Sequence, residues 1–169
     1  MVERCCGSWV GEQSAEDIIA NINESKMSKS EPVKLDDMNY LLDTNICVYF
    51  MRGKRNVAAK ISEIGQEHFF ISEMTLGELL YGAQCSDRPS ENIRAVHVFC
   101  QYVTILPMVN IWNEFAVQKA FLRKKGQLIE DADIIIGTTA IINNMVMVTE
   151  NVKHIGRLNG IVVENWMEK

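Results

Sequence analysis

The sequence lacks any long hydrophobic run, since none of its apolar stretches approaches the roughly 20 residues that cross a bilayer. Residues 1–5 also lack the apolar stretch of a secretory signal, so we expect a cytoplasmic protein without a membrane partner. The five cysteines are an odd number, and none has the paired spacing of a metal-binding motif. We therefore expect reduced thiols rather than a disulfide framework.

A broadly basic character is also missing, because the formal net charge is -5. Most of that charge lies near the start, where residues 1–37 hold four Lys/Arg and eight Asp/Glu. Residues 38–169 hold thirteen and fourteen, and they include basic groups at 52–55 and 123–125. This composition argues against a general nucleic-acid binder but leaves RNA binding open for residues 38–169, while the acidic start suits a basic partner.

What the chain does contain is a regular alternation of strand-like and helix-like segments. We predict strands at 39–42, 68–71, 102–106, 145–148 and 161–163. Between them we predict helices at 46–51, 57–64, 73–84, 90–99 and 110–124, a helix from Asp131 or Asp133 to 143, and one helical turn at 152–155. Such alternation is typical of an α/β fold with a doubly wound, mostly parallel sheet flanked by helices.

A separate amphipathic helix is predicted before the first strand. Ser14 is a good N-cap, and Asp17 three residues later forms a weaker version of the capping box. The apolar residues that share one face of this helix are Ala15, Ile18, Ile19 and Ile22. A helix of about three turns is marginal alone, so we expect it to pack on the rest of the chain. Residues 28–37 are polar and without periodicity, which is typical of a linker.

The candidate chemistry starts where the first strand ends. Asp43, Thr44 and Asn45 directly follow an apolar strand, and ligands of doubly wound sheets bind beyond the carboxyl ends of the strands. Glu78 and Asp133 also lie beside apolar runs, where a carboxylate is costly to desolvate unless it is paired or binds a cation. Converging carboxylates are the usual ligands of Mg²⁺ and Mn²⁺.

Each of these acids also has an ordinary structural explanation. Asp43 is a suitable helix N-cap, and Asp133 is suited to the first turn of a helix. Glu78 fits an exposed position on an amphipathic helix. Each signal alone is weak, and the prediction of a metal site rests on their order and combination.

Four ordered motifs in residues 38–169 resemble those of PIN-domain ribonucleases, the toxin half of bacterial VapBC-type toxin–antitoxin pairs. The motifs are Leu41-Leu-Asp43-Thr-Asn45, Ser72 with Thr75-Leu-Gly-Glu78-Leu, Asp133-Ile-Ile-Ile-Gly137-Thr-Thr-Ala140, and Val148-Thr149-Glu-Asn151 with His154. A stretch from Gly160 to Trp166 resembles the usual ending of the family. The resemblance implies a Mg²⁺/Mn²⁺-dependent endoribonuclease acting on tRNA or mRNA, and a homodimer.

The resemblance also assigns site residues. Asp43, Glu78 and Asp133 would be the catalytic metal ligands, and Thr44, Asn45, Ser72, Thr149 and Asn151 would surround and orient them. Many relatives carry an aspartate where this chain has Asn151, which leaves a fourth acidic ligand open. Glu150 and Asp131 are the alternatives for that role.

Residues 1–27 are similar to the toxin-wrapping end of VapB-type antitoxins. The chain would then consist of an antitoxin-like segment (1–27), a linker (28–37) and a PIN domain (38–169), with the nuclease neutralised by the segment. The residues implied to act in inhibition are Trp9, Ile18, Ile19, Ile22 and Lys26, with Lys29 as a second candidate for the basic residue that reaches the acids.

Two other functions are alternatives to the nuclease. A non-catalytic PIN-fold module for binding or assembly is the alternative, and Asn151 in place of an acid favours it. A phosphatase with an aspartyl nucleophile requires a second aspartate two positions after Asp43, where this chain has Asn45. The sequence therefore excludes the phosphatase and leaves two functions open, the nuclease and the non-catalytic module.

Overall fold

The computed structural model describes residues 14–27, 38–53 and 55–167. Its centre is a five-stranded sheet in which every neighbouring pair of strands is parallel. The strands are β1 (Tyr40–Leu42), β2 (Phe69–Ser72), β3 (Thr104–Leu106), β4 (Val146–Val148) and β5 (Val162–Glu164), in the order β3-β2-β1-β4-β5. The chain fills one side of β1 first and then crosses to the other, so the strand order reverses between β1 and β4. This is the point where a doubly wound sheet binds ligands.

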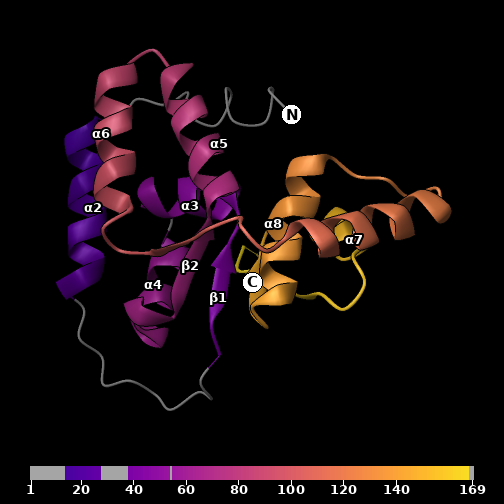
Figure 1. The fold of residues 1–169 in the computed structure, drawn as a ribbon. Coiled ribbons are helices and arrows are strands. Elements are labelled where there is room, and N and C mark those ends of the chain that lie inside the picture. The colour runs from indigo at the N-terminus through magenta and orange to yellow at the C-terminus, as the bar shows by residue number, and fades with distance from the viewer. Residues whose placement is uncertain (1–13, 28–37, 54, 168–169) are drawn as a thin grey trace.

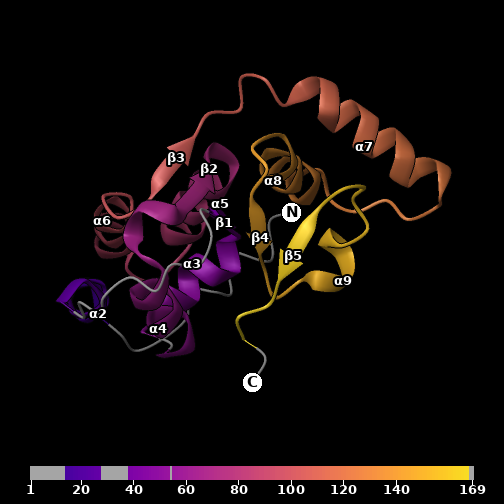
Figure 2. The same ribbon diagram turned by 90° about the horizontal axis from the view of Figure 1, so that it is seen from below.

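Helices cover both faces of the sheet (Figures 1 and 2). Their bounds are α2 (Ala15–Met27), α3 (Thr44–Met51), α4 (Arg55–Ile64), α5 (Glu73–Gln84), α6 (Pro89–Phe99), α7 (Trp112–Lys124), α8 (Asp131–Ile142) and α9 (Val152–Ile155), with a 3₁₀ turn at Gln66–His68. Across the described ranges, no helix has the length and apolar character needed to cross a membrane.

The two faces of β1 explain the two main cores. Successive side chains of a strand point to opposite faces, so Tyr40 and Leu42 enter one core and Leu41 the other. The first core packs mainly under α2 to α6, and the second under α8 and α9. Near the amino ends of the strands, Trp166 closes the first core against the rings of Tyr40 and Phe69, at 5.4 and 5.9 Å between ring centroids.

The predicted fold class is confirmed, with small corrections at the element ends. The sheet is parallel throughout rather than mostly parallel. His68 lies in the 3₁₀ turn instead of the second strand, and residues 102–103 precede the third strand. The helix predicted from Asp131 or Asp133 begins at Asp131. Ends shift by one or two residues because ladder hydrogen bonds, rather than composition, determine where a strand starts.

Helix α2 packs against α3, α4 and α6 and forms part of the first core. Ile18 and Ile22 are 3% and 0% exposed, and Ile19 is half-buried. The predicted capping box is present, since Ser14 and Asp17 exchange hydrogen bonds between side chain and backbone N–H. These bonds lower the pKa of Asp17, so they favour the helix start at neutral pH and are lost in acid. Trp9, Lys29 and the side chain of Lys26 lie outside the described residues.

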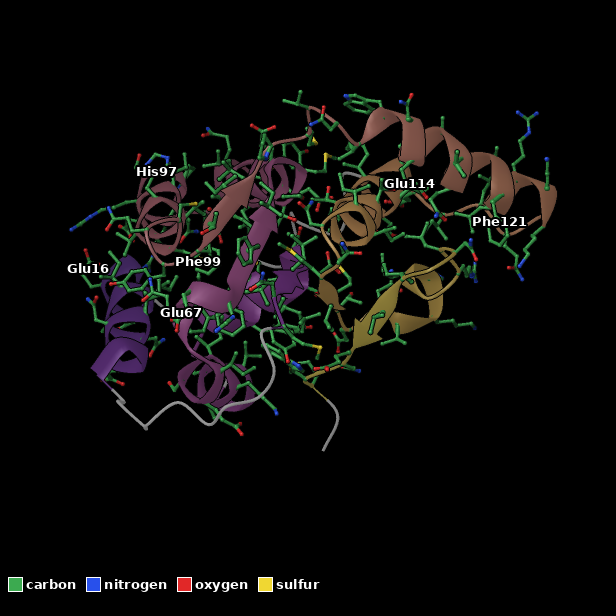
Figure 3. All side chains as sticks on the ribbon, turned by 60° about the horizontal axis from the view of Figure 1, so that its bottom comes forward. Glu16, Glu67, His97, Phe99, Glu114 and Phe121 are labelled. Atoms are coloured by element: carbon green, nitrogen blue, oxygen red, sulfur yellow. The ribbon has the colours of Figure 1, made fainter. Side chains whose placement is uncertain are left out.

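Polar contacts fix the direction of α2. Glu16 pairs with Arg94 in α6 at 3.5 Å, and the hydroxyl of Tyr102, just beyond α6, donates to Oδ1 of Asn23 at 2.7 Å. Figure 3 shows Glu16 beside α6, whose Phe99 faces inward while His97 faces outward. The two helices therefore run the same way. Because α6 leads into β3, the Met27 end of α2 lies toward the amino ends of the strands.

Gly137, in the middle of α8, is required by close packing. A Cβ added there would overlap Cδ1 of Leu158 and lie 3.3 Å from Cδ1 of Ile161. Because Leu158 is only 3% exposed, it has little space into which to move. We expect Gly137→Ala to lower the free energy of unfolding by about 1–3 kcal/mol in urea denaturation. Gly77→Ala in α5 is the matched control, since nothing lies within 4 Å of its added Cβ. It should raise that free energy by about 0.5–1 kcal/mol, and an equal gain at Gly137 would contradict the packing argument.

Candidate active site

Asp43 stands directly beyond β1, at the point where the strand order reverses. Its backbone N–H continues the ladder by donating to the carbonyl of Val148 at 2.9 Å. The carboxylate is 6% exposed and caps α3, because Oδ1 accepts the N–H of Thr44 at 2.8 Å. Oδ2 accepts the hydroxyl of Thr149, which follows β4, at 2.5 Å. Asp43 is thus a helix cap and also a member of a polar cluster that joins two strands.

Glu78 reaches this cluster from α5. That helix begins after β2, where Ser72 caps it by accepting the N–H of Thr75 at 3.0 Å. The hydroxyl of Thr44 donates to Oε2 of Glu78 at 2.5 Å. Glu78 is half-buried and therefore does not occupy the fully solvated helix face that was one alternative. Ser72 therefore orients α5, and its hydroxyl bonds with Thr75 instead of with one of the three acids.

Asp133 joins from the first turn of α8, where it is 5% exposed. The carboxamide of Asn151 donates to its Oδ2 at 3.4 Å, a long bond. The backbone N–H of Asn151 donates to the hydroxyl of Thr149 at 2.9 Å. A continuous chain of hydrogen bonds therefore runs from Asp133 through Asn151 and Thr149 to Asp43, and on through Thr44 to Glu78. The structure brings the three predicted acids together at one edge of the sheet.

The two alternative acids have other partners. Glu150 is exposed and accepts the hydroxyl of Tyr49 at 2.6 Å, a bond that raises the pKa of Tyr49 to about 12. Asp131 pairs with Lys119 at 2.7 Å on the outer side of α8. The residue that contacts Asp133 from the loop after β4 is Asn151, so this position contributes an amide rather than a fourth carboxylate.

Other buried groups near the acids are neutral. Cys47, fully buried in α3, has a pKa raised well above its usual value by burial and, to a lesser extent, by the charges of Asp43, Cys100 and Glu78. Its thiol is therefore protonated and is not a thiolate ligand.

The side-chain oxygen of Asn45, two residues after Asp43, is buried without a hydrogen-bond partner in the structure. An unpartnered buried acceptor costs about 1–3 kcal/mol, which indicates a site for a further donor or cation.

The acids are linked through hydroxyl and amide groups rather than through direct contact. Within the described ranges, no three His, Cys, Asp or Glu side chains are grouped so that they hold a metal ion as they stand.

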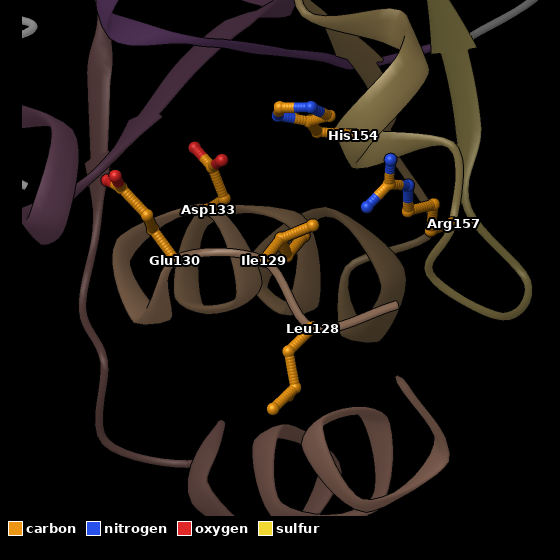
Figure 4. A pocket seen from close by; sticks show the side chains of 6 residues that line it. All are labelled: Leu128, Ile129, Glu130, Asp133, His154 and Arg157. Atoms are coloured by element: carbon orange, nitrogen blue, oxygen red, sulfur yellow. The ribbon is translucent and has the colours of Figure 1, made fainter. Parts of the chain in front are cut away.

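A cavity of about 330 Å³ that no sequence pattern predicts adjoins Asp133. It is lined by Leu128, Ile129, Glu130, Asp133, His154 and Arg157 (Figure 4). His154 belongs to a quoted motif, but Arg157 follows a glycine in a turn and carries no pattern that marks it as functional. A single arginine in a connecting segment gives no sequence signal, because its surroundings come from α8 and from residues 128–130.

Comparison with known proteins gives the family. A family model of the PIN domain matches residues 40–157. Ribonuclease VapC2 of Haemophilus influenzae is 33% identical over 133 residues, which cover 77% of this chain and 99% of that protein. The chain belongs to the PIN-domain family. A second relative, from Shigella flexneri, is named tRNA(fMet)-specific endonuclease VapC. It is 28% identical over 130 residues, which cover 76% of this chain and 98% of that protein.

Solved structures agree with this assignment. VapBC2 from Rickettsia felis, crystallised with a DNA fragment from its promoter, matches with a TM-score of 0.70 and 29% identity, over 76% of this chain and 99% of that chain. The predicted resemblance of residues 38–169 to VapC ribonucleases is confirmed. The PIN-domain match begins at residue 40, beyond α2, so the antitoxin resemblance of residues 1–27 stays a prediction.

Proposed function

We propose that this chain is a VapC-type endoribonuclease that hydrolyses RNA phosphodiesters with Mg²⁺ or Mn²⁺. Asp43, Glu78 and Asp133 would hold the cation. The observation that carries the proposal is the hydrogen-bonded chain that joins these three carboxylates, from three different elements, where the strand order reverses. The membership in the PIN family and the names of the VapC relatives support the same reaction.

The donor set fits a hard divalent cation. The acids provide carboxylate oxygens, and the unpartnered buried oxygen of Asn45 adds an acceptor close to them in the chain. Histidine is absent from the hydrogen-bonded chain, and the buried thiol of Cys47 is protonated, which disfavours a zinc-type site. When bound, such a cation supplies a water nucleophile of lowered pKa and stabilises negative charge on the phosphate.

The polar neighbours of the acids have a positioning role in this proposal. Thr149 and the N–H of Thr44 hold the two oxygens of Asp43, so the carboxylate keeps one orientation. The hydroxyl of Thr44 holds Glu78, and Asn151 holds Asp133. Three carboxylates without a cation repel a phosphodiester, so we expect RNA to engage this edge only when the cation is present.

Helix α2 is proposed to be the antitoxin-like part of the chain. It fills an apolar surface formed with α3, α4 and α6, which is how amphipathic helices bind grooves on partner proteins. Its Met27 end lies at the edge of the sheet opposite the acids, so Lys26 begins far from the acids of its own chain. Within one chain, inhibition would act through α3, which α2 contacts and whose Thr44 holds Glu78.

Partners follow from the same proposal. RNA, with tRNA or mRNA as the class, would be the substrate. A VapB-type antitoxin would be one protein partner, because VapBC2 from Rickettsia felis is a VapBC pair. A second copy of the chain would be the other, as the resemblance of the motifs to PIN-domain ribonucleases implies.

One observation favours the alternative, a non-catalytic PIN-fold module for binding or assembly. Asn151 stands where the resemblance gives many relatives an aspartate, and the acids of the described residues are not already arranged as a metal site. The discriminating property is cation binding, because a module for assembly alone has no requirement for it.

The test uses the full chain. We expect calorimetry to detect Mn²⁺ binding that is weakened at least about tenfold by Asp133→Asn, since one anionic ligand is lost. Cleavage of a mixed tRNA pool should stop in EDTA and return with excess Mg²⁺ or Mn²⁺. Cleavage that persists in EDTA would refute the metal assignment, and absence of both binding and cleavage would favour the assembly module.

A further inference from the structure

The cavity beside Asp133 has two chemically different ends. Glu130 and Asp133, from the start of α8, provide carboxylates, while His154 and Arg157, from α9 and the turn after it, face them across the cavity (Figure 4). Ile129 and Leu128 add apolar surface between α7 and α8. Because Asp133 also belongs to the acid cluster, the cavity continues directly from the proposed site of hydrolysis.

Arg157 is positioned as a donor that the fold does not use. Within the part of the chain that the structure describes, its guanidinium makes no hydrogen bond and no ion pair, and the side chain is half-buried. Its backbone is firmly held, since its N–H donates to the carbonyl of His154 at 3.1 Å and the next residue, Leu158, is buried. An immobilised arginine with a free planar fork is suited to a phosphate group.

Helix α7 holds both walls of the cavity. The side chain of Gln118, 2% exposed, exchanges two hydrogen bonds of 2.9 Å with the backbone of Asn159, two residues after Arg157. The neighbouring Lys119 pairs with Asp131 at the start of α8. The cavity is therefore built on fixed elements and does not depend on the rotamer of one surface loop.

We propose that this cavity binds the nucleotide next to the scissile phosphodiester, with Arg157 donating to its phosphate and His154 lying beside its sugar or base. A volume of about 330 Å³ lies at the lower end of ligand pockets and suits one nucleotide unit. Ile129 and Leu128 offer apolar contact to the flat face of a base. The site is thus a determinant of substrate binding, and it rests on the proposed nuclease function.

Electrostatics predicts how the site behaves. Glu130 and Asp133 bring two carboxylates to the lining against the one guanidinium of Arg157, so a phosphate gains little without a cation. A divalent cation at Asp133 reverses the sign of the local charge. We therefore expect nucleotides to bind more tightly in Mg²⁺ than in EDTA, and to depend on Arg157 in both conditions.

The experiment measures binding of AMP, CMP, GMP and UMP to the full chain by calorimetry, in Mg²⁺ and in EDTA. Arg157→Gln should weaken nucleotide binding at least about tenfold, because a charge-assisted hydrogen bond to the phosphate is lost. Arg157→Lys keeps the charge without the fork and should lie between the two. Arg88→Gln, an exposed arginine in the segment before α6, is the matched control and should bind as the parent chain does.

Cleavage of a short oligoribonucleotide separates this proposal from the nuclease assignment. We expect Arg157→Gln to raise KM more than it lowers kcat. Unchanged nucleotide binding by both Arg157 variants would overturn the subsite even if RNA is cleaved normally. Arg157-dependent nucleotide binding without any cleavage would support the phosphate contact and sink the nuclease assignment instead.

Discussion

Asp43→Asn should reduce RNA cleavage by at least about a hundredfold, measured as kcat/KM on the tRNA pool with saturating Mg²⁺. The substitution keeps the shape of the side chain and removes the charge that would bind the cation. Loss of an electrostatic contribution of several kcal/mol to the transition state corresponds to two or more powers of ten. Asp43 is the residue chosen because its carboxylate is linked to the other two acids through Thr44 and Thr149.

The fold should survive this change. Asparagine is nearly as good an N-cap as aspartate, so α3 keeps its first hydrogen bond to the N–H of Thr44. We expect the free energy of unfolding without metal to fall little or even to rise, since a buried charge is removed. Asp87→Asn is the matched control, because it removes an exposed carboxylate from the segment before α6, away from the three acids. That variant should retain most of the activity, and full activity of Asp43→Asn would reject the assignment of the site.

Ile22→Asp should increase RNA cleavage by the full chain at least about tenfold. Ile22, in α2, is completely buried in the first core, where a carboxylate without a partner is strongly disfavoured. The expected result is undocking of α2, which loses roughly 1.5–3 kcal/mol of apolar burial as well. Once α2 leaves α3, the contact through which we propose that it inhibits the site is removed. Cleavage rates of the two chains at equal concentration give the measurement.

Ala20→Asp provides the control for added charge, since Ala20 lies on the exposed side of the same helix. Hydrogen exchange of the amides in residues 15–27 reports whether α2 has undocked. Rapid exchange without faster cleavage would show that α2 only completes the core. Reduced cleavage in Ile22→Asp would mean that α3 needs α2 to hold its position, which is the opposite of inhibition.

Much of the site was predictable because its acids follow elements with clear patterns. Asp43 comes directly after an apolar run, and the strand and helix alternation places that run in a parallel sheet. Parallel strands end at one edge, so Asp43 and Thr149 had to be near each other once β1 and β4 were neighbours. The capping role of Ser14 was equally local, because its partner Asp17 is only three residues away.

The contacts between distant residues were not predictable in the same way. The bond from Thr44 to Glu78 joins positions 34 apart and depends on how α5 is inclined toward β1. The engagement of Glu150 by Tyr49 depends on a neighbouring helix, and nothing near Glu150 in the sequence indicates it. Arg157 lines a cavity only because residues 128–133 lie opposite it. Such contacts arise from tertiary packing, and no periodic pattern in a single sequence predicts them.

The adjacent side chains of Gln118 and Lys119 give α7 a mechanical role that its outlying position conceals. Gln118 is hydrogen-bonded to the turn after α9, and Lys119 forms an ion pair at the start of α8, so α7 links the two elements that border the cavity. A tilt of α7 would widen or narrow the cavity without any change in the sheet. In the nucleotide site that we propose, the width of the cavity would therefore depend on the position of α7.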